Sequence, residues 1–326
     1  MKREADLPIV DPNEGLATSA LERGIKETGF FLLRDRTVAL EALHELRRET
    51  YAFFSKPSEE KMKYQVPGRG YVCLRGEDSM AGFGEGTYGS GDQCEKYTMG
   101  PMVSGDEKAS NPADYQAPEA ESFFEENIFP NPSFRQAWET YYQQMRLLAE
   151  ELMDAIRTVL GFSSDHWREY TDHPVSIMRF LAYPSVSVQD ERLGAHYDDD
   201  LITILHQSPT ANGFDALEVM LPGESEWQSV PADDEMFVVN FGQMMTYLSG
   251  GKVVSTKHRV ASPPENLVNG SARSSVAYFH TPNWNARLKP VSASGMDQNL
   301  GQASANFHLE ELLEPDGTVL FYKVLQ

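Results

Sequence analysis

The sequence predicts a mainly β fold with flanking helices, of the sandwich or jelly-roll type. After about residue 175 the apolar residues gather in short runs, which turn-forming pairs such as Asn212-Gly213 separate. The gaps between the runs are too short for the helices that a parallel α/β sheet requires, and evenly spaced short strands are typical of a sandwich or jelly roll. The runs are Ile177–Tyr183, Leu201–His206, Leu217–Leu221, Met236–Phe241, Val253–Val260 and Ser274–His280.

The first half of the chain is predicted to be mostly helical. Apolar residues recur there every three or four positions, which is the spacing of an amphipathic helix. The first such stretch ends at Gly29, and residues 30–33 follow as a short buried strand. Residues 65–133 are rich in Gly, Pro, Ser and acidic residues, and they predict long functional loops with a little strand. The helical stretches are the one carrying Leu16, Leu21 and Ile25, then residues 38–54 and residues 134–160.

The composition argues against several classes of partner. Among 326 residues there are 28 Lys and Arg against 49 Asp and Glu, so the net charge of −21 disfavours nucleic acid and anionic membranes. Two cysteines, Cys73 and Cys94, cannot form a disulfide framework and fit a reducing compartment. Residues 1–10 lack the apolar run of a signal peptide, and no stretch approaches the length of a membrane span. We therefore expect a cytoplasmic protein that acts on a small molecule.

A His-x-Asp/Glu motif occurs twice, against about 1.2 matches expected by chance from eight histidines and 49 acidic residues in 326. The copy made of His196 and Asp198 precedes the β run at residues 201–206, and residues two apart on an extended segment point to the same side. The copy made of His308 and Glu310 falls in a predicted short helix, where such residues diverge, and no histidine follows. We predict that His308 is a surface residue.

A third metal ligand, His258, is available in the β region. With His196 and Asp198 it makes two histidines and one carboxylate, the facial set of non-haem Fe(II) oxygenases, which leaves positions open for other ligands. Zinc is the alternative metal, because mixed carboxylate and imidazole sites also bind it. His206 lies in an apolar run and is predicted to be a hydrogen-bonded histidine of the core or pocket wall.

Arg273 and Ser275 begin the last β run and share one face of it, while Ser274 faces away. A guanidinium binds a carboxylate through two hydrogen bonds, and a hydroxyl beside it adds one more. A buried arginine needs an anionic partner, and the local sequence offers none, so a bound carboxylate ligand is predicted. The alternative is a surface arginine on an edge strand.

Shorter motifs accompany these residues along nearly the whole chain. In the first half they are Leu7–Asp11, Thr28–Phe31, Phe53–Lys61, Arg69–Tyr71 and Tyr97–Gly100. In the second half they are Met178–Phe180, Tyr183-Pro184, Pro209–Phe214, Ser249–Val253, His258–Ala261 and Gly270–Val276. With them the chain resembles the Fe(II)/2-oxoglutarate-dependent oxygenases of the isopenicillin N synthase-like family, and within it the deacetoxycephalosporin C synthase (expandase) and hydroxylase type.

The resemblance implies a role for each of the five polar residues. His196, Asp198 and His258 would bind Fe(II). Arg273 would pair with the distal carboxylate of 2-oxoglutarate, and Ser275 would donate a hydrogen bond to it. The cosubstrates would be 2-oxoglutarate and O₂, and the core would be a double-stranded β-helix, or jelly roll.

The resemblance also places Arg179 and Arg69 where expandase-type enzymes present arginines to a substrate carboxylate. This chain departs from that type at Leu181 and Gly68, where the type carries further arginines, so half of the expected clamp is missing. The expected substrate is a small, carboxylated secondary metabolite of the antibiotic-biosynthesis type, and a β-lactam is one option. The reaction would be hydroxylation, desaturation or ring expansion, with formation of succinate and CO₂.

The resemblance divides the chain into two parts. Residues 1–165 would form the helical and loop-rich N-terminal part of non-haem dioxygenases, and residues 166–326 the jelly-roll core. Residues 65–100 and the C-terminal tail would act as lids. Two alternatives remain at this point: an oxidase that needs no 2-oxoglutarate, like isopenicillin N synthase, and a non-catalytic or zinc-binding jelly-roll protein.

Overall fold

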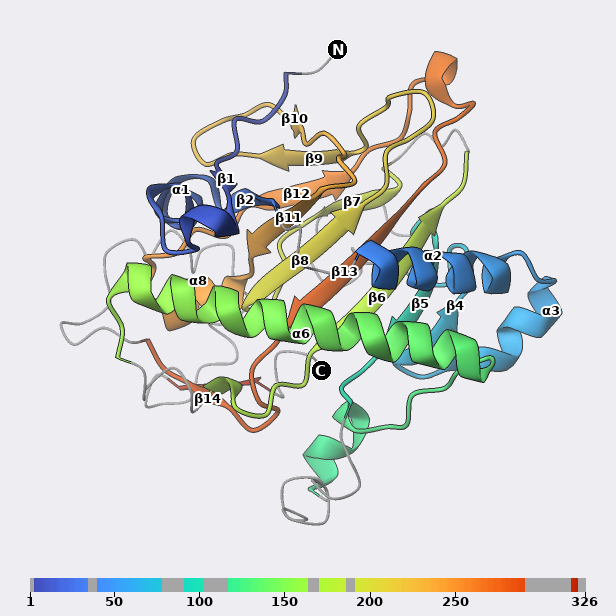
Figure 1. Ribbon diagram of the computed structural model, residues 1–326, viewed down its shortest axis with the longest axis horizontal. Coiled ribbons are helices and arrows are strands. Elements are labelled where there is room, and N and C mark those ends of the chain that lie inside the picture. The colour runs from blue at the N-terminus through green and yellow to red at the C-terminus, as the bar shows by residue number, and fades with distance from the viewer. Residues whose placement is uncertain are drawn as a thin grey trace.

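The protein is described by a computed structural model in which two β-sheets face each other and two long helices cover the larger sheet (Figure 1). The described residues are 3–34, 40–77, 91–102, 117–163, 170–185, 191–290 and 318–321. None of the helices in these ranges has both the length and the apolar character needed to cross a bilayer. The predicted mainly β fold with flanking helices is confirmed.

The larger sheet contains nine strands within the described residues, and every neighbouring pair is antiparallel except the first, which is parallel. In spatial order they are β1 (Ile9–Val10), β2 (Phe30–Arg34), β11 (Met236–Phe241), β8 (Ile202–Gln207), β13 (Arg273–His280), β6 (Ile177–Tyr183), β5 (Glu95–Met99), β4 (Arg69–Val72) and β3 (Gln65–Val66).

A smaller antiparallel sheet lies against the inner face of the larger one. Its strands, in spatial order, are β10 (Gln228–Ser229), β9 (Leu217–Met220), β12 (Lys257–Val260) and β7 (Leu193–His196). A separate pair joins β14 (Arg287–Leu288) to β15 (Val319–Leu320).

The space between the two sheets is filled by side chains from both. Leu181 of β6 and Ala277 of β13 pack in one buried cluster with Leu193 of β7 and Val260 of β12. Because successive side chains of a strand point to opposite faces, these positions fix which residues of each strand face inward. Residues two positions from them along the same strands therefore also face the interior.

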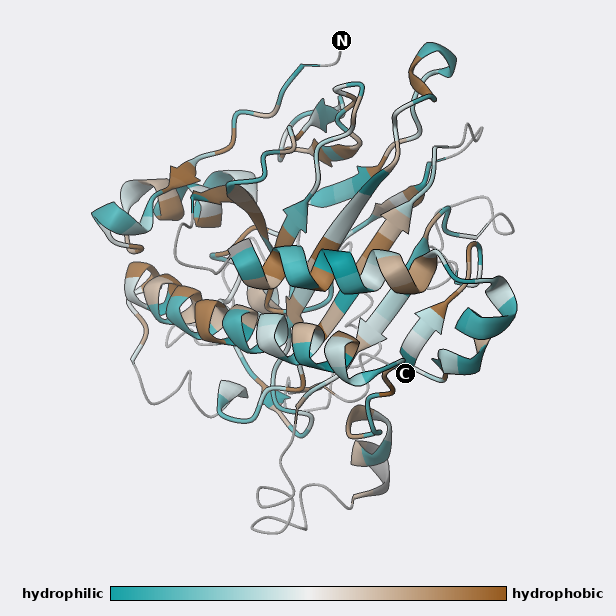
Figure 2. Ribbon diagram, turned by 45° about the vertical axis from the view of Figure 1, so that its right-hand side comes forward, coloured by the Kyte–Doolittle hydropathy of each residue, from teal (hydrophilic) through white to brown (hydrophobic). Residues whose placement is uncertain are grey.

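Two long helices, α2 (Leu40–Phe54) and α6 (Pro132–Leu160), cover the outer face of the larger sheet (Figure 1). They are joined through fully buried Trp138 of α6, whose indole nitrogen donates to Thr50 Oγ1 of α2 over 3.0 Å. Figure 2 shows both helices carrying hydrophobic and hydrophilic residues, as amphipathic helices do when one side packs on a core.

The ends of α6 follow from local chemistry. Asn131 caps the first turn by accepting a hydrogen bond from the backbone nitrogen of Phe134 over 2.9 Å, and Gly161 ends the helix in the left-handed conformation with φ of 70°. The predicted helix at residues 134–160 therefore begins two residues later than the observed one and ends with it.

The first helical stretch also ends at a glycine. Helix α1 (Ser19–Arg23) continues as the π-helical segment η2 (Gly24–Thr28), and Gly29 follows with φ of 67°. A Cβ at Gly29 would lie 2.2 Å from Thr256 Oγ1, so this position requires glycine for space as well as for its backbone conformation. The other short helices are η1 (Pro12–Glu14), α3 (Ser58–Lys61), η3 (Met62–Tyr64), η4 (Pro118–Phe123), α8 (Gln243–Leu248) and η5 (Glu265–Leu267).

Strands from the first half of the chain extend the larger sheet at both edges. Strand β2 pairs with β11, and β5 pairs with β6, so one hydrogen-bonded sheet spans both predicted parts. The division of the chain at residues 165 and 166 stays a prediction. Within residues 65–133, predicted as loops with a little strand, the structure contains β3, β4 and β5.

The predicted C-terminal lid lies largely outside the described residues, which resume only at residues 318–321. In that short stretch β15 pairs with β14, and the Phe321 ring lies 5.8 Å from that of Phe123. Residues 78–90 of the other predicted lid also lie outside the described residues.

Candidate metal centre and carboxylate pocket

His196, Asp198 and His258 lie together between the two sheets. His196 ends β7 and pairs directly with His258 in β12, while Asp198 follows just beyond the strand. The Nε2 atoms of His196 and His258 lie 3.5 Å and 3.6 Å from Asp198 Oδ1. One ligand atom from each residue lies within 4.8 Å of the others, so the three can hold a single metal ion. The structure thus brings the three predicted ligands together.

Backbone carbonyls orient both imidazoles. His196 Nδ1 lies 2.8 Å from the carbonyl oxygen of Gly194, and His258 Nδ1 lies 3.2 Å from that of Thr256. A proton on each Nδ1 satisfies these carbonyls and leaves each Nε2 lone pair directed at Asp198. The edge of the Phe30 ring meets His258 at 5.4 Å between ring centroids and fixes its plane.

The two oxygens of the Asp198 carboxylate have different partners. Oδ2 accepts hydrogen bonds of 2.6 Å from both Thr203 Oγ1 and Asn240 Nδ2, whereas Oδ1 faces the two histidines. Thr203 and Asn240 are buried on adjacent strands, β8 and β11, and pair directly with each other. The carboxylate is therefore held rigidly with one oxygen presented to the metal position.

A second buried carboxyl, Asp200, completes this hydrogen-bond chain. Thr203 Oγ1 lies 2.7 Å from Asp200 Oδ2 as well as 2.6 Å from Asp198, but one hydroxyl has only one proton to donate. Burial, and then the charge of Asp198, raise the pKa of Asp200 well above its usual value. A neutral Asp200 can donate from Oδ2 to Thr203, which then donates to Asp198, so both contacts of the Thr203 hydroxyl have a proton.

The protonation preferences of the three residues fit a metal site. Burial, followed by the charge of His196, lowers the pKa of His258 to about 4, so its imidazole is neutral at physiological pH. Burial alone would raise the pKa of Asp198, but His258 and then His196 lower it; burial would lower the pKa of His196, but its contact with Asp198 raises it. Two imidazoles and one carboxylate on one side suit Fe(II), and a bound metal ion would take over the charge-balancing role of a proton on His196.

Arg273 and Ser275 of β13 lie on the inner face of the larger sheet, where both side chains are buried. Arg273 donates to Gln207 Oε1 over 3.0 Å, and its guanidinium lies 5.1 Å from the centre of the Tyr183 ring. Ser275 pairs directly with Gln207 and Leu181 on the neighbouring strands. Within the described residues no carboxylate forms an ion pair with Arg273, so its charge is available to a bound anion.

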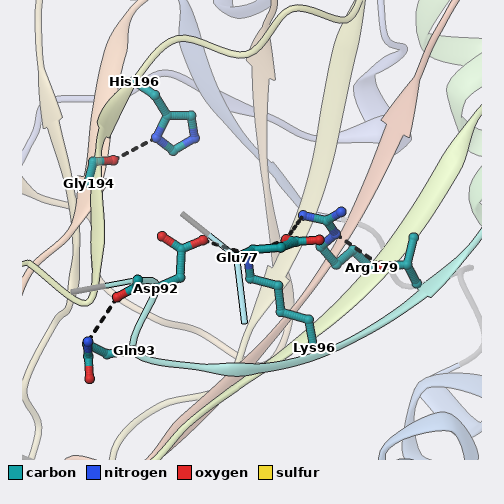
Figure 3. Close-up of polar contacts among 9 residues, drawn as sticks. Glu77, Asp92, Gln93, Lys96, Arg179, Gly194 and His196 are labelled. Carbon is teal, nitrogen blue, oxygen red and sulfur yellow. Dashed lines mark hydrogen bonds and ion pairs between the residues drawn. The ribbon is translucent and has the colours of Figure 1, made fainter. Parts of the chain in front are cut away.

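A cluster of four charged residues continues this inner face. Arg179 donates from Nε to Thr98 Oγ1 over 3.2 Å and from Nη1 to Glu77 Oε2 over 3.1 Å. Lys96 Nζ lies 2.6 Å from the same Glu77 oxygen and 2.5 Å from Asp92 Oδ2. Figure 3 shows both cations converging on Glu77, with Asp92 between Glu77 and His196 in that view. Arg179 therefore lies on the inner face, where it already contacts a carboxylate, and its predicted role toward a substrate carboxylate stays a prediction.

Charged residues of this cluster affect the pKa values of His196 and of Glu77. Asp198 and the carbonyl of Gly194 raise the pKa of His196, and the charge of Asp92 adds to their effect. Burial would raise the pKa of Glu77, but Arg179 and then Lys96 lower it, so Glu77 is ionised at neutral pH. The cluster contains two positive and two negative groups, and they balance.

The structure does not bring Arg69 to this site. Gly70 pairs with Thr98, which pairs with Arg179, so Arg69 lies on the opposite face of the sheet. Its guanidinium is buried, donates to the carbonyls of Gly68 and Phe123, and leaves no space for a side chain at Gly100.

Two further histidines, His206 and His308, are predicted from the sequence to lie outside the metal site. His206 is buried on the helix-covered face, with Nε2 3.0 Å from the carbonyl of Asp234 and Nδ1 3.0 Å from Arg47 Nη2. It is a hydrogen-bonded core residue. His308, predicted to be a surface residue, lies outside the described residues.

The sequence did not predict the residues that orient Asp198 and Arg273 or that contact Arg179. Thr203 and Asn240 are polar residues inside apolar β runs, and that pattern is a detectable signal of a buried polar network. Gln207 ends such a run in the same way. Lys96 and Glu77 carried no such signal, because they lie in or beside a segment whose strands could not be recognised from its composition.

Two family models match the chain. The model described as 2OG-Fe(II) oxygenase superfamily matches residues 173–282, which include the metal triad and the Arg273 strand. The model described as non-haem dioxygenase in morphine synthesis N-terminal matches residues 6–124.

Curated relatives and solved structures agree with these matches. The chain is 30% identical to 2-oxoglutarate-dependent dioxygenase thnC of Trichoderma harzianum over 300 residues, 86% of each chain. It is 26% identical to deacetoxycephalosporin C synthase of Amycolatopsis lactamdurans over 92% of this chain and 91% of that one. The crystal structure of a full-length Neurospora crassa protein in complex with alpha-KG has the same fold, with a TM-score of 0.70 and 22% identity over 92% of this chain and 95% of that one.

Proposed function

This chain belongs to the 2OG-Fe(II) oxygenase superfamily, and from that premise we propose which residues carry the reaction and what kind of substrate it oxidises. The enzyme is a dioxygenase that uses Fe(II), with 2-oxoglutarate and O₂ as cosubstrates. It is an oxygenase of secondary metabolism. The expandase type suggested by the sequence stays a prediction, because fungal dioxygenases match at a similar level of identity.

Fe(II) binds to His196, Asp198 and His258. The observation that carries this assignment is the convergence of both Nε2 atoms on Asp198 Oδ1, while hydrogen bonds occupy the opposite atom of each ligand. Three protein ligands leave the remaining positions of an octahedral ion open to other ligands. Bound Fe(II) supplies the redox chemistry in which O₂ and 2-oxoglutarate are consumed, with formation of succinate and CO₂ as the substrate is oxidised.

The distal carboxylate of 2-oxoglutarate binds to Arg273 and Ser275. Support comes from the burial of Arg273, from its lack of an ion pair within the described residues, and from the hydroxyl of Ser275 on the same face. Gln207 and Tyr183 hold the guanidinium in place before the ligand arrives. A guanidinium fixed in this way binds the carboxylate with less loss of side-chain entropy.

The substrate is a small carboxylated metabolite that binds beside Arg179. Arg179 is 27% exposed on the inner face and has one nitrogen, Nη2, that is not engaged by Thr98 or Glu77. Because Glu77 already neutralises part of this charge, a substrate carboxylate would take over the contact that Glu77 makes. A β-lactam acid is one member of this class, since deacetoxycephalosporin C synthase is among the relatives. The outcome would be hydroxylation, desaturation or ring expansion.

A substrate panel tests this function. Small carboxylic acids and their methyl esters, β-lactams included, are incubated with the enzyme, Fe(II), 2-oxoglutarate and air, and succinate is measured. We expect an acid to raise succinate release above the substrate-free rate, and its ester to do so less. Equal stimulation by acid and ester would contradict recognition of a carboxylate at Arg179. A His258→Gln variant gives the rate that is independent of the metal site.

A further inference from the structure

Arg192 is fully buried and directly precedes β7, four residues before His196. Its guanidinium donates from Nη1 to the carbonyl of Ser271 over 2.9 Å and from Nη2 to Ser271 Oγ over 2.8 Å and the carbonyl of Pro184 over 3.0 Å. All three acceptors are uncharged, and Nε is buried with no hydrogen-bond partner among the described residues. Within the described part of the chain no carboxylate forms an ion pair with Arg192.

The acceptors of Arg192 connect it to Arg273. Ser271 lies two residues before Arg273 in the segment that leads into β13, and Pro184 directly follows Tyr183, against which the Arg273 guanidinium packs. Burial, and then the charge of Arg273, lower the pKa of Arg192 to about 10. Arg192 therefore remains protonated at neutral pH, and two like charges are held near each other inside the protein.

The other buried cations of the described residues lack this combination of uncharged acceptors and a like charge nearby. Lys96 contacts Asp92 and Glu77, and Lys61 contacts Glu95. Arg69 also donates to carbonyl oxygens, and burial lowers its pKa, but the negative charge of Glu125 raises it. Burial of a charge without a countercharge is strongly unfavourable, and a second like charge nearby increases the cost. Arg192 and Arg273 would therefore be stabilised by an anion that enters the space between the sheets.

We propose that Arg192 is a second cation of the 2-oxoglutarate subsite, which attracts the distal carboxylate through space and holds the start of β13 so that Arg273 meets that carboxylate. Arg192 does not touch the ligand, because its Nη atoms are already engaged by Ser271 and Pro184. It is a positioning residue with an electrostatic effect. The inference rests on the assignment of Arg273 as the carboxylate anchor.

The test compares two 2-oxo acids that differ only in the distal charge. Dissociation constants of 2-oxoglutarate and of 2-oxopentanoate, which lacks the distal carboxylate, are measured anaerobically on the Fe(II)-loaded protein by calorimetry. For Arg192→Gln we expect 2-oxoglutarate to bind on the order of tenfold more weakly, while 2-oxopentanoate is unaffected. Arg192→Lys keeps the charge and should recover most of the affinity for 2-oxoglutarate.

A second measurement needs no change at Arg192. In Arg273→Gln, where the direct anchor is gone, 2-oxoglutarate should still bind more tightly than 2-oxopentanoate because Arg192 remains. Equal weakening of both acids in Arg192→Gln, or complete loss of the preference in Arg273→Gln, would overturn the proposal. If Arg273→Gln instead leaves 2-oxoglutarate binding unchanged, the anchor assignment in the proposed function is wrong, which is a distinguishable result.

Discussion

His258 lies directly opposite His196 across the antiparallel pair of β12 and β7, with ring centroids 4.3 Å apart and both Nε2 atoms facing one oxygen of Asp198. The hydrogen-bond register of the smaller sheet sets this relationship. A shift of one residue in that register would turn one histidine to the other face of the sheet. The metal position is therefore a property of strand pairing, which gives it more rigidity than a site built on loops.

Replacing Asn240 with Ala should weaken metal binding without removing a ligand. Asn240 donates to Asp198 Oδ2, and without it the carboxylate loses one of the two groups that direct Oδ1 to the metal. We expect the affinity for Fe(II), measured by anaerobic titration, to fall about 10- to 100-fold. Asn13→Ala, at an exposed position in η1 where the side chain donates to Asp11, is the matched control. An unchanged affinity would show that Thr203 alone orients the ligand.

Replacing Arg273 with Gln should raise the concentration of 2-oxoglutarate that the enzyme requires. Loss of a charged partner for a buried carboxylate costs about 1.5–3 kcal/mol, which is roughly 10- to 100-fold in the dissociation constant. Affinity for Fe(II) should stay nearly unchanged, because Arg273 contacts Gln207 and Tyr183 and none of the metal ligands. Arg135→Gln on the exposed side of α6 is the control. An unaltered 2-oxoglutarate requirement would rule out Arg273 as the anchor.

Replacing Glu77 with Gln should strengthen the binding of a carboxylated substrate. Glu77 contacts both Arg179 and Lys96, so its neutralisation frees positive charge for the ligand. We expect KM for an acid found in the panel to fall several-fold, whereas Arg179→Gln should raise it; the gain is bounded by the few tenths to one kcal/mol typical of partly exposed ion pairs. If both variants change KM for an acid and its methyl ester equally, Arg179 does not recognise the carboxylate.

The stability of the protein should fall as the pH drops from about 6.5 toward 4. Burial lowers the pKa of both His206 and His280 to about 4, while the unfolded chain binds these protons near pH 6.5. Between these values the unfolded state holds more protons, so the free energy of unfolding decreases with decreasing pH. Each histidine contributes on the order of 2 kcal/mol to the difference between pH 7 and pH 5.

Urea unfolding at the two pH values measures this effect. His206→Gln should reduce the loss of stability between pH 7 and pH 5, because its neutral amide has no proton to gain. His173→Gln, at an exposed position, is the matched control. An identical loss of stability in the His206→Gln variant and the wild type would mean that His206 is not buried as a neutral side chain.

Sequence reasoning reached the metal site because strand periodicity alone sets the side of the strand to which residues two apart point. It therefore placed His196 with Asp198, and Arg273 with Ser275, before their partners were known. It failed at Arg69, where a motif likeness gave no information on which face of the sheet the side chain occupies. In the structure the Arg69 side chain lies on the helix-covered face and donates a hydrogen bond to the carbonyl of Phe123.

The contacts of Glu77 with Lys96 and Arg179 could not be predicted from the sequence, for a different reason. Lys96 and Arg179 meet only because β5 pairs with β6, two strands that are about eighty residues apart in the chain. Glu77 joins them from a loop. Long-range pairing of this kind is set by the packing of the whole sheet, and a local pattern does not contain it. The same applies to Arg192, whose partners Ser271 and Pro184 come from two other segments.

Anaerobic addition of 2-oxoglutarate to the Fe(II)-loaded protein, followed by visible absorption, tests the central assignment most directly. We expect a weak charge-transfer band that saturates at one equivalent of each component, because His196, Asp198 and His258 would hold one ion with room for the keto acid, and Arg273 would hold the distal carboxylate. The band should be absent in His258→Gln and should require more 2-oxoglutarate in Arg273→Gln. A band of full intensity in His258→Gln, or none in the wild type despite bound Fe(II), would contradict the assignment.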